Sequence, residues 1–561
     1  MSRLFTILAS LTLSLLPFRS QAVWHEPYDL PRIYWDIASR QQIFPSGNYA
    51  RMIPLQDGRL MIVAEAGGGI SCSYSDDGGA TWSAPGLIVG NASNLPYAVP
   101  DLIQLVDGTI IVGFNPRPSQ PYSDDRRFGI RVMRSCDNGR TWQGPIFVYD
   151  AQPNFKDGCW EPSFLELPDG ELQLYFANEN NFTHSDEQEI SMCRSFDKGQ
   201  TWSEPVRISY RAGCRDGMPV PLLTDSSEIV VIIEDNGHPE CRGFRATTVR
   251  SPLSHNWAEW VDAQSTDRQM IFADRLDKEA VSAAPYLRKL KGGSTVASWQ
   301  GNGDDRSGLG EGQYDMFVAV GDADAKGFRA ISRPFGLPLD KHALWNSLGI
   351  DHDGNVFAIA SIGDMGKGNA INIMKGYPMK CFTADYMPSC GEKQTSPNEI
   401  FMGAVTRKRS AMHFRYDADK LYFHARVLDG NVNADMSDND GITLALDMAN
   451  RSDTSPQKGI YRIILGANGT INISEGDAGK WNEIQTPEDI SFGTDIRSTH
   501  YDVDLALPWT ALGCESAPVG RDMRCLIEVR DRRDSTLLRD TIPDADQNQS
   551  WTWPQLRLSP D

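Results

Sequence analysis

The chain has 561 residues, of which 40% are hydrophobic and 23% charged, with 49 Gly and 33 Pro. This length exceeds the roughly 250–300 residues at which one hydrophobic core stops growing, so we expect at least two folding units, or a fold that grows by repeats. The formal net charge of −20 repels phosphate backbones and anionic lipids, so we expect neither nucleic acid nor a membrane as a partner.

Residues 1–22 have the features of a secretory signal peptide. Arg3 precedes an apolar run, residues 4–18, and Ser20-Gln21-Ala22 supplies small residues at both positions that determine cleavage. No later stretch approaches the ~20 apolar residues of a membrane helix. We therefore expect a secreted protein, extracellular or periplasmic, and a monomer.

Three copies of one motif follow at equal spacing. Each copy has Ser, Asp, Gly and Thr-Trp in the pattern Ser-x-Asp-x-Gly-x-Thr-Trp, and successive copies begin 60 residues apart, at Ser75, Ser135 and Ser195. In such a motif the Asp caps backbone N–H groups of a turn, the Gly takes a positive φ and the Trp packs between neighbouring sheets. These Asp-boxes predict a repeated β-structure.

A second repeat consists of an apolar strand, a two-residue turn and another apolar strand. The runs are too short for helices and are bounded by turn residues. The six turns are Asp57-Gly58, Asp107-Gly108, Asp169-Gly170, Ser226-Ser227, Gly292-Gly293 and Asp353-Gly354. Six such hairpins, with room for two more strands each, predict a six-bladed β-propeller over residues 23–392.

The repeats stop after Pro397, and longer alternating strands begin. Residues 420–426, 442–447, 461–465, 501–507 and 526–530 alternate apolar and polar side chains. This pattern predicts a β-sandwich domain over residues 396–561. The overall fold class expected is therefore all-β.

Ten cysteines in an exported chain favour disulfide bonds, and the local pairs Cys381–Cys390 and Cys514–Cys525 are the first candidates. No Cys-x-x-Cys motif or histidine cluster is present, so we expect no catalytic metal and no required cofactor.

The hairpin turns provide a common register for the blades, and two sets of positions are expected to meet at one end of the central channel. The first set, six residues before each turn, is Arg51, Asp101, Ser163, Val220, Tyr286 and Ser347. The second set, eight residues after each turn, is Glu65, Asn115, Ala177, Glu234, Gln300 and Ser361. A carboxylate that ends an apolar strand, as Glu234 does, costs desolvation and so indicates function.

Residues upstream of the first set add Glu161 and Asn346, which lie one or two places before it, and Arg215 and Asp216, which lie five and four places before Val220. The expected channel then holds several carboxylates beside arginines, amides and aromatic rings. Glycoside hydrolysis needs one carboxyl group that stays protonated as general acid and a second that acts as nucleophile or base. The pattern therefore favours a glycosidase.

Several of these stretches together resemble glycoside hydrolase family 93, the exo-acting α-1,5-L-arabinanases. The resemblance covers most of the predicted propeller. It rests on Ser46-Gly-Asn-Tyr-Ala-Arg51, Trp160-Glu-Pro162, Arg215-Asp-Gly-Met218, Ile233-Glu234, Ala284-Pro-Tyr286, Ser298-Trp-Gln300 and Trp345-Asn-Ser-Leu348.

The resemblance implies a six-bladed propeller that releases short L-arabinose units, such as arabinobiose, from arabinan with retained anomeric configuration. It implies Glu161 and Glu234 as the catalytic pair, with Glu161 as nucleophile and Glu234 as general acid/base. We expect the other polar channel residues to bind the saccharide: Arg51, Glu65, Asp101, Arg215, Asp216, Tyr286, Gln300 and Asn346.

The carboxy-terminal region resembles carbohydrate-binding module family 9 through Leu421-Tyr-Phe423, Asp438-Asn-Asp-Gly441 and Asp504-Leu-Ala-Leu-Pro-Trp509. The resemblance implies a domain that tethers the enzyme to polysaccharide. A structural Ca²⁺ in an acidic loop is a candidate cofactor of this domain, with Asp438 and Asp440 as candidate ligands.

Three alternatives stay open. A sialidase shares the fold and the Asp-boxes but needs three arginines that grip a carboxylate and a Tyr nucleophile. A propeller polysaccharide lyase needs a His or Tyr base beside a uronate-binding Arg, for which Tyr286 and His238 are the candidates. A glycan-binding protein without activity would gain nothing from unpaired buried acids.

Overall fold

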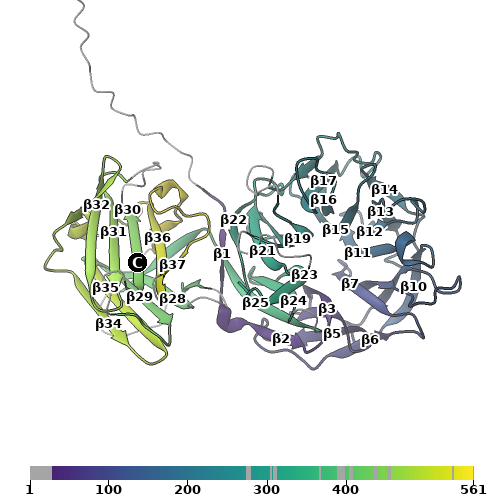
Figure 1. The fold of residues 1–561 in the computed structure, drawn as a ribbon, viewed down its shortest axis with the longest axis horizontal. Helices are drawn as coiled ribbons and strands as arrows, with labels where there is room; N and C mark the ends of the chain where they lie inside the picture. Colours follow the sequence, from purple (N-terminus) through teal and green to yellow (C-terminus); the bar gives the residue numbers. More distant parts are fainter. Residues whose placement is uncertain are drawn as a thin grey trace, which may run out of the picture.

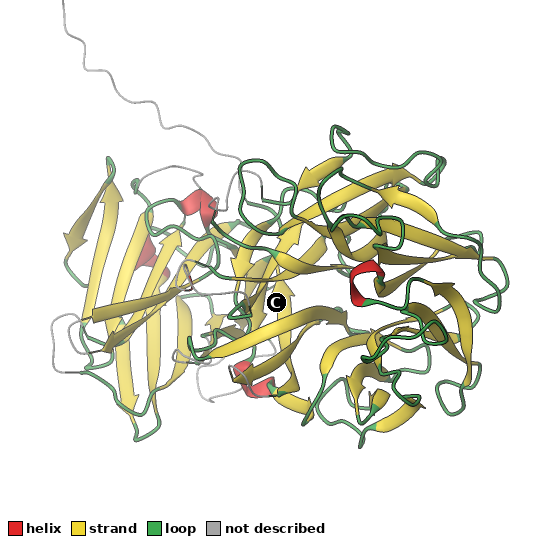
Figure 2. Ribbon diagram, turned by 45° about the vertical axis from the view of Figure 1, so that its right-hand side comes forward, coloured by secondary structure: helices red, strands yellow, loops and turns green. Residues whose placement is uncertain are grey.

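The computed structural model describes residues 28–272, 279–303, 306, 312–364, 368–387, 398–403, 409–434, 439–448, 450, 456–533 and 536–559. The predicted signal peptide lies outside these residues. Strands make up nearly all of the regular structure (Figure 2). The short 3-10 turns are η1 (Ile37–Ser39), η2 (Phe155–Asp157), η4 (Trp509–Leu512) and η5 (Ser550–Thr552).

Six antiparallel sheets surround a central channel, each with its first strand innermost (Figure 1). Blade 1 contains β3 (Asn48–Pro54), β4 (Leu60–Ala66), β5 (Gly69–Ser75) and β6 (Gly86–Gly90). Blade 2 contains β7 (Tyr97–Gln104), β8 (Ile110–Pro116), β9 (Gly129–Ser135) and β10 (Gln143–Asp150). Blade 3 contains β11 (Cys159–Glu166), β12 (Leu172–Asn178), β13 (Glu189–Ser195) and β14 (Val206–Ser209).

The chain closes the ring by pairing its two ends. Blade 4 contains β15 (Asp216–Leu223), β16 (Glu228–Asp235), β17 (Arg245–Pro252) and β18 (Arg268–Met270). Blade 5 contains β19 (Ala283–Lys289), β20 (Thr295–Gly301), β21 (Asp315–Gly321) and β22 (Arg329–Ser332). Blade 6 contains β23 (Lys341–Ile350), β24 (Val356–Asp364) and β25 (Asn369–Met379), and the amino-terminal β1 (Arg32–Trp35) and β2 (Gln41–Phe44) both pair with β25. The predicted six-bladed propeller is confirmed.

The Asp-boxes have the structural role that the sequence predicts. In the first copy Asp77 accepts hydrogen bonds from the N–H and the hydroxyl of Thr81, at 2.8 and 2.6 Å. The same bonds recur at Asp137 and Asp197. The glycine of each copy has a positive φ, and Trp82, Trp142 and Trp202 each pack against a core cluster that spans neighbouring blades.

The second domain is one continuous sheet that curls on itself, at the left of Figure 1. Its first strands are β26 (Cys381–Tyr386), β27 (Ile400–Met402), β28 (Ser410–Tyr416), β29 (Lys420–Leu428), β30 (Gly441–Asp447), β31 (Ile460–Gly466) and β32 (Ile471–Asp477). The remaining strands are β33 (Lys480–Ile484), β34 (Ser491–Ile496), β35 (His500–Pro508), β36 (Met523–Arg533), β37 (Thr536–Thr541) and β38 (Gln555–Leu558). Buried residues of β28, β29 and β35 face those of β30, β31 and β36 across one core, as in a sandwich.

The boundary between the two units falls earlier than the sequence suggests. Strand β25 ends the propeller at Met379, and β26 already pairs in parallel with β28 and β38 of the second sheet. The propeller therefore ends between Met379 and Cys381, and the expected end at residue 392 is too late. A short hydrophobic strand at a blade edge has the same sequence pattern in either sheet, so periodicity could not assign it.

One expectation about cysteines is wrong. Cys514 and Cys525 are both free thiols, and Cys525 is buried in the core of the second domain. Cys390 lies outside the described residues, so the Cys381–Cys390 pair stays a prediction. No helix in the described part of the chain is long and apolar enough to cross a membrane.

Candidate active site

Each of the six innermost strands contains a β-bulge close to its first residues, at the end of the channel that we call the mouth. In every blade the ladder register shifts there, and one residue takes a φ between 46° and 55°. This left-handed conformation is unfavourable for residues other than glycine. Because it recurs in all six blades, we infer that the bulges are a regular structural feature of the propeller. The six residues are Tyr49, Val99, Glu161, Met218, Ala284 and Trp345.

Side chains on the second strands hold these bulges in place. In most blades the side chain accepts a hydrogen bond from the bulge N–H of the next blade. Ser361 accepts from Tyr49, Glu65 from Val99, Asn115 from Glu161, Glu234 from Ala284, and Gln300 from Trp345. These acceptors are the second set predicted from the hairpin register, which confirms that this set lies at one end of the channel.

Blade 3 breaks the pattern. Its second-strand position is Ala177, which has no acceptor for the bulge N–H of Met218 in blade 4. The carboxylate of Glu161 instead hydrogen-bonds the Met218 backbone. Glu161 is the one carboxylate among the six bulge residues, and it lies where the ring of acceptors is incomplete.

The environment of Glu161 raises the pKa of its carboxyl group into the neutral range. Burial raises the pKa of Glu161 to about 7; the nearby charges of Glu234 and Glu179 act in the same direction. Arg117 and the Met218 backbone stabilise the ionised form and partly oppose this shift. Part of the Glu161 surface stays accessible, so a ligand in the channel can reach it.

Glu234 lies on β16, next to the strand that contains Met218, and its environment resembles that of Glu161. Burial also raises the pKa of Glu234 to about 7, opposed by the hydrogen bond from Ala284 and by Arg215. One carboxylate oxygen accepts the Ala284 N–H at 2.7 Å. Like Glu161, Glu234 is partly accessible. Two carboxyls from neighbouring blades that can each hold or release a proton near pH 7 form a candidate acid–base pair.

Arg117, Trp160 and Glu179 surround this pair, and the register analysis missed them. The Arg117 guanidinium lies 4.9 Å from the ring centroid of Trp160, and its Nε is buried without a hydrogen-bond partner among the described residues. Glu179 is buried, bonds Trp160 and forms an ion pair with Arg215. Arg117 and Glu179 each follow a register position by two residues, so extending the register downstream as well as upstream would have found both.

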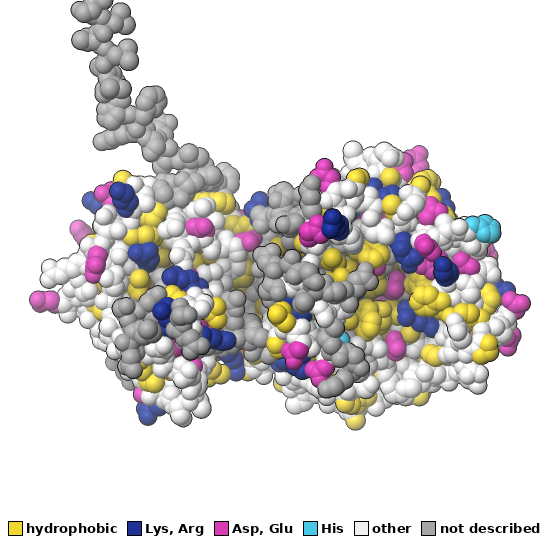
Figure 3. Space-filling view, viewed as in Figure 1, with side chains coloured by type: hydrophobic (Ala, Val, Ile, Leu, Met, Phe, Trp, Pro, Cys, Tyr) yellow, Lys and Arg dark blue, Asp and Glu magenta, His cyan; other side chains and the backbone are white. Residues whose placement is uncertain are grey.

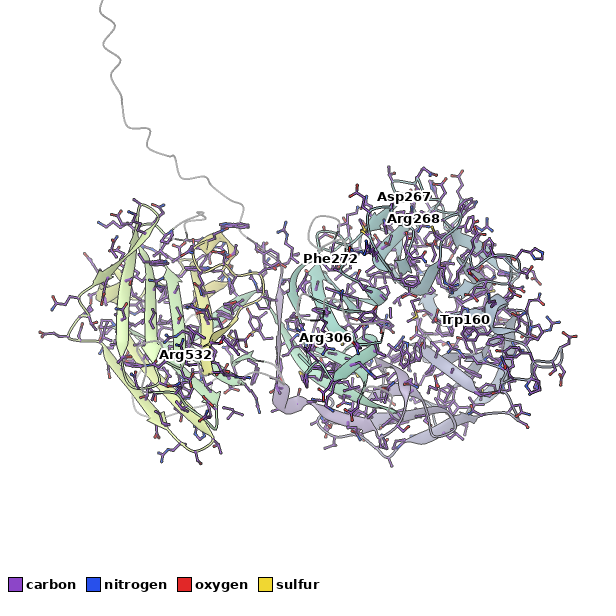
Figure 4. The ribbon with its side chains drawn as sticks, in the orientation of Figure 1. Trp160, Asp267, Arg268, Phe272, Arg306 and Arg532 are labelled. Carbon is purple, nitrogen blue, oxygen red and sulfur yellow. The ribbon has the colours of Figure 1, made fainter. Side chains whose placement is uncertain are left out.

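The mouth is lined by aromatic rings as well as by charge. Tyr49 and Trp345 stack with ring centroids 4.8 Å apart, and Trp160, labelled in Figure 4, packs against Phe155 at 4.9 Å. Phe155 is 60% exposed. The space-filling view shows a hollow at the centre of the propeller, with acidic side chains in it beside hydrophobic and basic ones (Figure 3).

The residues of the first register set lie deeper in the channel than expected, because the bulges shift them away from the mouth. Asp101 accepts from Ser163 at 2.6 Å and from the hydroxyl of Tyr286 at 3.2 Å, and Arg51 lies over the Tyr286 ring at 4.9 Å. Arg51, Asp101 and Tyr286 are each at most 4% exposed. Tyr286 bonds Asp101, and the Arg51 guanidinium over its ring donates to the carbonyls of Ala50 and Trp345. These buried groups line a small cavity beside Glu161.

The other predicted binding residues have structural partners. Asp216 is fully buried in a two-point ion pair with Arg268, at 2.8 and 2.7 Å, so the expectation that it contacts substrate is wrong. Asn346 is fully buried between Ser298 and the Ala284 carbonyl, so it does not contact substrate either. Glu65 and Gln300 are partly exposed and act as bulge acceptors. Arg215 stays at the mouth beside Glu179.

The acidic loop of the second domain gives no support to a metal ion within the described residues. Asp438 lies outside them. Asp440 is fully buried and accepts backbone N–H bonds from Asn433 and Arg532. No group of three or more His, Cys, Asp or Glu side chains in the described ranges could hold a metal. A structural Ca²⁺ stays a prediction.

No protein-family model matches the sequence, and no curated protein matches it either. Among solved structures, an α-L-arabinofuranosidase of Fusarium graminearum with arabinobiose is 19% identical, covering 62% of this chain and 97% of that chain, with a TM-score of 0.46. An α-L-arabinanase of Penicillium chrysogenum with arabinobiose is 17% identical, covering 62% and 97%, with a TM-score of 0.45. A family 9 carbohydrate-binding module of Caldicellulosiruptor kristjanssonii with glucose is 15% identical, covering 32% and 97%, with a TM-score of 0.27.

These neighbours include the two families that the sequence resembles, at identities that leave membership of either family a prediction.

Proposed function

We propose that the protein is a retaining exo-glycosidase in which Glu161 and Glu234 form the catalytic pair. The observation that carries this proposal is the pair of partly accessible glutamates from neighbouring blades, both with a pKa of about 7, at the incomplete position of the bulge ring. Retaining glycosidases need two such carboxyls, one ionised and one protonated in the same state.

In the proposed first step, the Glu161 carboxylate attacks the anomeric carbon while Glu234 donates its proton to the glycosidic oxygen. The bond to the leaving sugar breaks and a glycosyl–Glu161 ester forms. In the second step, the Glu234 carboxylate takes a proton from water, the water oxygen attacks the anomeric carbon, and Glu161 leaves. The positive charge of Arg117 supports the ionised nucleophile.

The small size of the cavity below the mouth supports exo action. The cavity that Arg51, Asp101 and Tyr286 line beside Glu161 has room for about one water molecule, so we propose that a polysaccharide enters the mouth by its end and does not thread through. We propose linear α-1,5-arabinan as the substrate and arabinobiose as the product, as the family resemblance implies. We also propose that the protein acts outside the cell.

The alternatives fit the site less well. A sialidase needs a Tyr nucleophile that touches the sugar, but Tyr286 is 1% exposed and bonded to Asp101 and Arg288. A lyase base at His238 is also unsupported, because His238 bonds Thr247 and lies against Asp235. A binding protein without activity would not need two carboxyls with raised pKa values.

Product analysis on linear arabinan tests this proposal. Wild type should release arabinobiose, and Glu161→Gln or Glu234→Gln should lower kcat by about 10²–10⁴-fold or more, because each removes a group that acts in the transition state. The control is Glu228→Gln, at the opposite end of the strand that carries Glu234. Activity on sialyl-lactose or ulvan, with none on arabinan, would contradict the proposed substrate.

A further inference from the structure

The outer edge of blade 3, together with the connection between β17 and β18 of blade 4, carries an aromatic cluster that the catalytic mechanism does not use. We name its members, Phe182, Arg207, Tyr210 and Trp260, the outer platform. Phe182 and Tyr210 stack with ring centroids 5.1 Å apart and an interplanar angle of 11°, and the Trp260 ring lies 6.0 Å from Tyr210. Trp260 is 44% exposed, and Phe182 and Tyr210 are half-buried.

A single arginine fixes the three rings. The Arg207 guanidinium lies 4.7 Å from Tyr210, 5.3 Å from Trp260 and 5.9 Å from Phe182, measured to ring centroids. Glu189, which is 2% exposed, pairs with Arg207 from below. The Tyr210 hydroxyl donates to Glu187. The rings are thus held rigidly and the charges around them are paired, so little entropy is lost when a ligand covers the ring faces.

The outer platform is connected to the proposed catalytic site by two short segments. The loop after β12 carries Glu179, which bonds Trp160 and Arg215, and then Phe182, whose N–H bonds the Glu179 carbonyl at 2.8 Å. The segment after β14 runs from Tyr210 to Arg215. Strand β14 lies at the rim in Figure 1, three strands out from β11, which is about 14 Å at the usual strand spacing.

We propose that the outer platform is a second saccharide site, which binds a neutral polysaccharide chain whose end occupies the catalytic channel. Sugar rings present an apolar C–H face to an aromatic ring and hydroxyl groups to the polar edge around it, and the platform offers both. Its ion pairs are already satisfied, and the net charge of −20 repels uronate chains, so a neutral chain fits best. This inference rests on the proposed function for the position of the chain end.

The test compares polymer with short substrate in Trp260→Ala and Tyr210→Ala. The control is Phe196→Ala, because Phe196 is 76% exposed and lies in the Asp-box turn at the opposite end of the same blade. Each platform variant should lose about tenfold in kcat/KM on linear arabinan, the loss expected for one or two aromatic contacts. Activity on an aryl arabinoside should not change, and Phe196→Ala should match wild type on both.

Affinity electrophoresis through a panel of neutral polysaccharides separates this inference from the proposed function. If wild type hydrolyses no arabinan but one polysaccharide retards wild type more than Trp260→Ala, the function fails and the saccharide site stands. If the platform variants match Phe196→Ala in both retardation and polymer hydrolysis, or if no polysaccharide retards wild type, the outer platform is not a saccharide site.

Discussion

Glu161 occupies a left-handed backbone position and carries a carboxyl group in a poorly solvated channel, and both features cost folding free energy. Glu234 shares the second cost. Because both pKa values are raised from 4.5 to about 7, the folded protein binds more protons than the unfolded chain between these two values. The contribution of this pair to folding stability is therefore complete below pH 4.5, and it is lost as the pH rises through about 7.

Replacing Glu161 by Gln, its neutral isostere, should remove the loss of folding stability that ionisation of Glu161 causes. Glu161→Gln is expected to raise the thermal midpoint relative to wild type at pH 8 and to leave it unchanged at pH 4, where both carboxyls are protonated in both states. Thermal melts at a series of pH values measure the difference. A variant that is less stable than wild type at pH 8 would show that Glu161 is a structural ion-pair member.

The same groups predict the pH dependence of activity. The retaining cycle needs one ionised and one protonated glutamate, so kcat/KM should follow a bell with its maximum near pH 7 and apparent pKa values on either side that belong to the pair. Steady-state rates on an aryl arabinoside between pH 4 and 10 record the curve. An activity that keeps rising to pH 10 would exclude a carboxylic acid as proton donor.

At the scale of the strand, the bulge ring explains why one blade differs from the other five. Ala177 leaves the Met218 N–H to Glu161, whereas its counterpart in blade 6, Ser361, accepts the equivalent N–H. Ala177→Ser should supply that acceptor, so Glu161 should lose a bond that favours its ionised form, and the acidic limb of the rate profile should move to higher pH. Ser361→Ala, on the far side of the channel, is the control; equal profiles for both variants would contradict this role of Ala177.

A second element-scale prediction concerns the hairpin of blade 4. Five of the six hairpin turns place a glycine at φ 88–94°, but Ser227 takes this position in blade 4 with φ 61°. Ser227→Gly removes an unfavourable left-handed residue and should stabilise the propeller by about 1 kcal/mol, less the extra entropy of glycine in the unfolded chain. Urea unfolding midpoints give the value, and Gly58→Ser should shift the midpoint in the opposite direction.

These elements also show what the sequence could predict. The Asp-boxes and hairpin turns determine blade number and which second-strand residues share the mouth, because both depend on local turn chemistry. The bulges cannot be recognised in the sequence, because Tyr49, Val99 and Met218 are residue types with no preference for positive φ. A register counted without them places Arg51, Asp101 and Tyr286 at the wrong depth, and it cannot reveal that Asp216 meets Arg268 from another strand of the same blade.

At the scale of the whole molecule, the two domains are joined by buried contacts as well as by the chain. Arg32 on β1 is 1% exposed and donates to the carbonyls of Pro543 and Thr552 in the second domain, and Tyr377 stacks on Phe401 at 5.4 Å. Strand β1, which helps to close the propeller, is therefore also anchored to the second domain.

Arg32→Ala should leave two buried carbonyls without their donors. The free energy of unfolding should fall by about 2–3 kcal/mol. Calorimetry should show a lower midpoint and, where wild type has one transition, a separation into two. Arg409→Ala, which removes a more exposed ion pair to Asp36, is the control and should change little. Equal effects of both variants would contradict a specific anchor at Arg32.

Azide rescue on an activated aryl arabinoside tests the central claim most directly, because it assigns a role to each glutamate. Glu234→Ala should be reactivated by azide and give the arabinosyl azide with retained configuration, since the Glu161 ester still forms. Glu161→Ala should give the inverted azide. The opposite pair of configurations would exchange the two roles, and the absence of rescue in both variants, with activity intact, would contradict Glu161 and Glu234 as the catalytic pair.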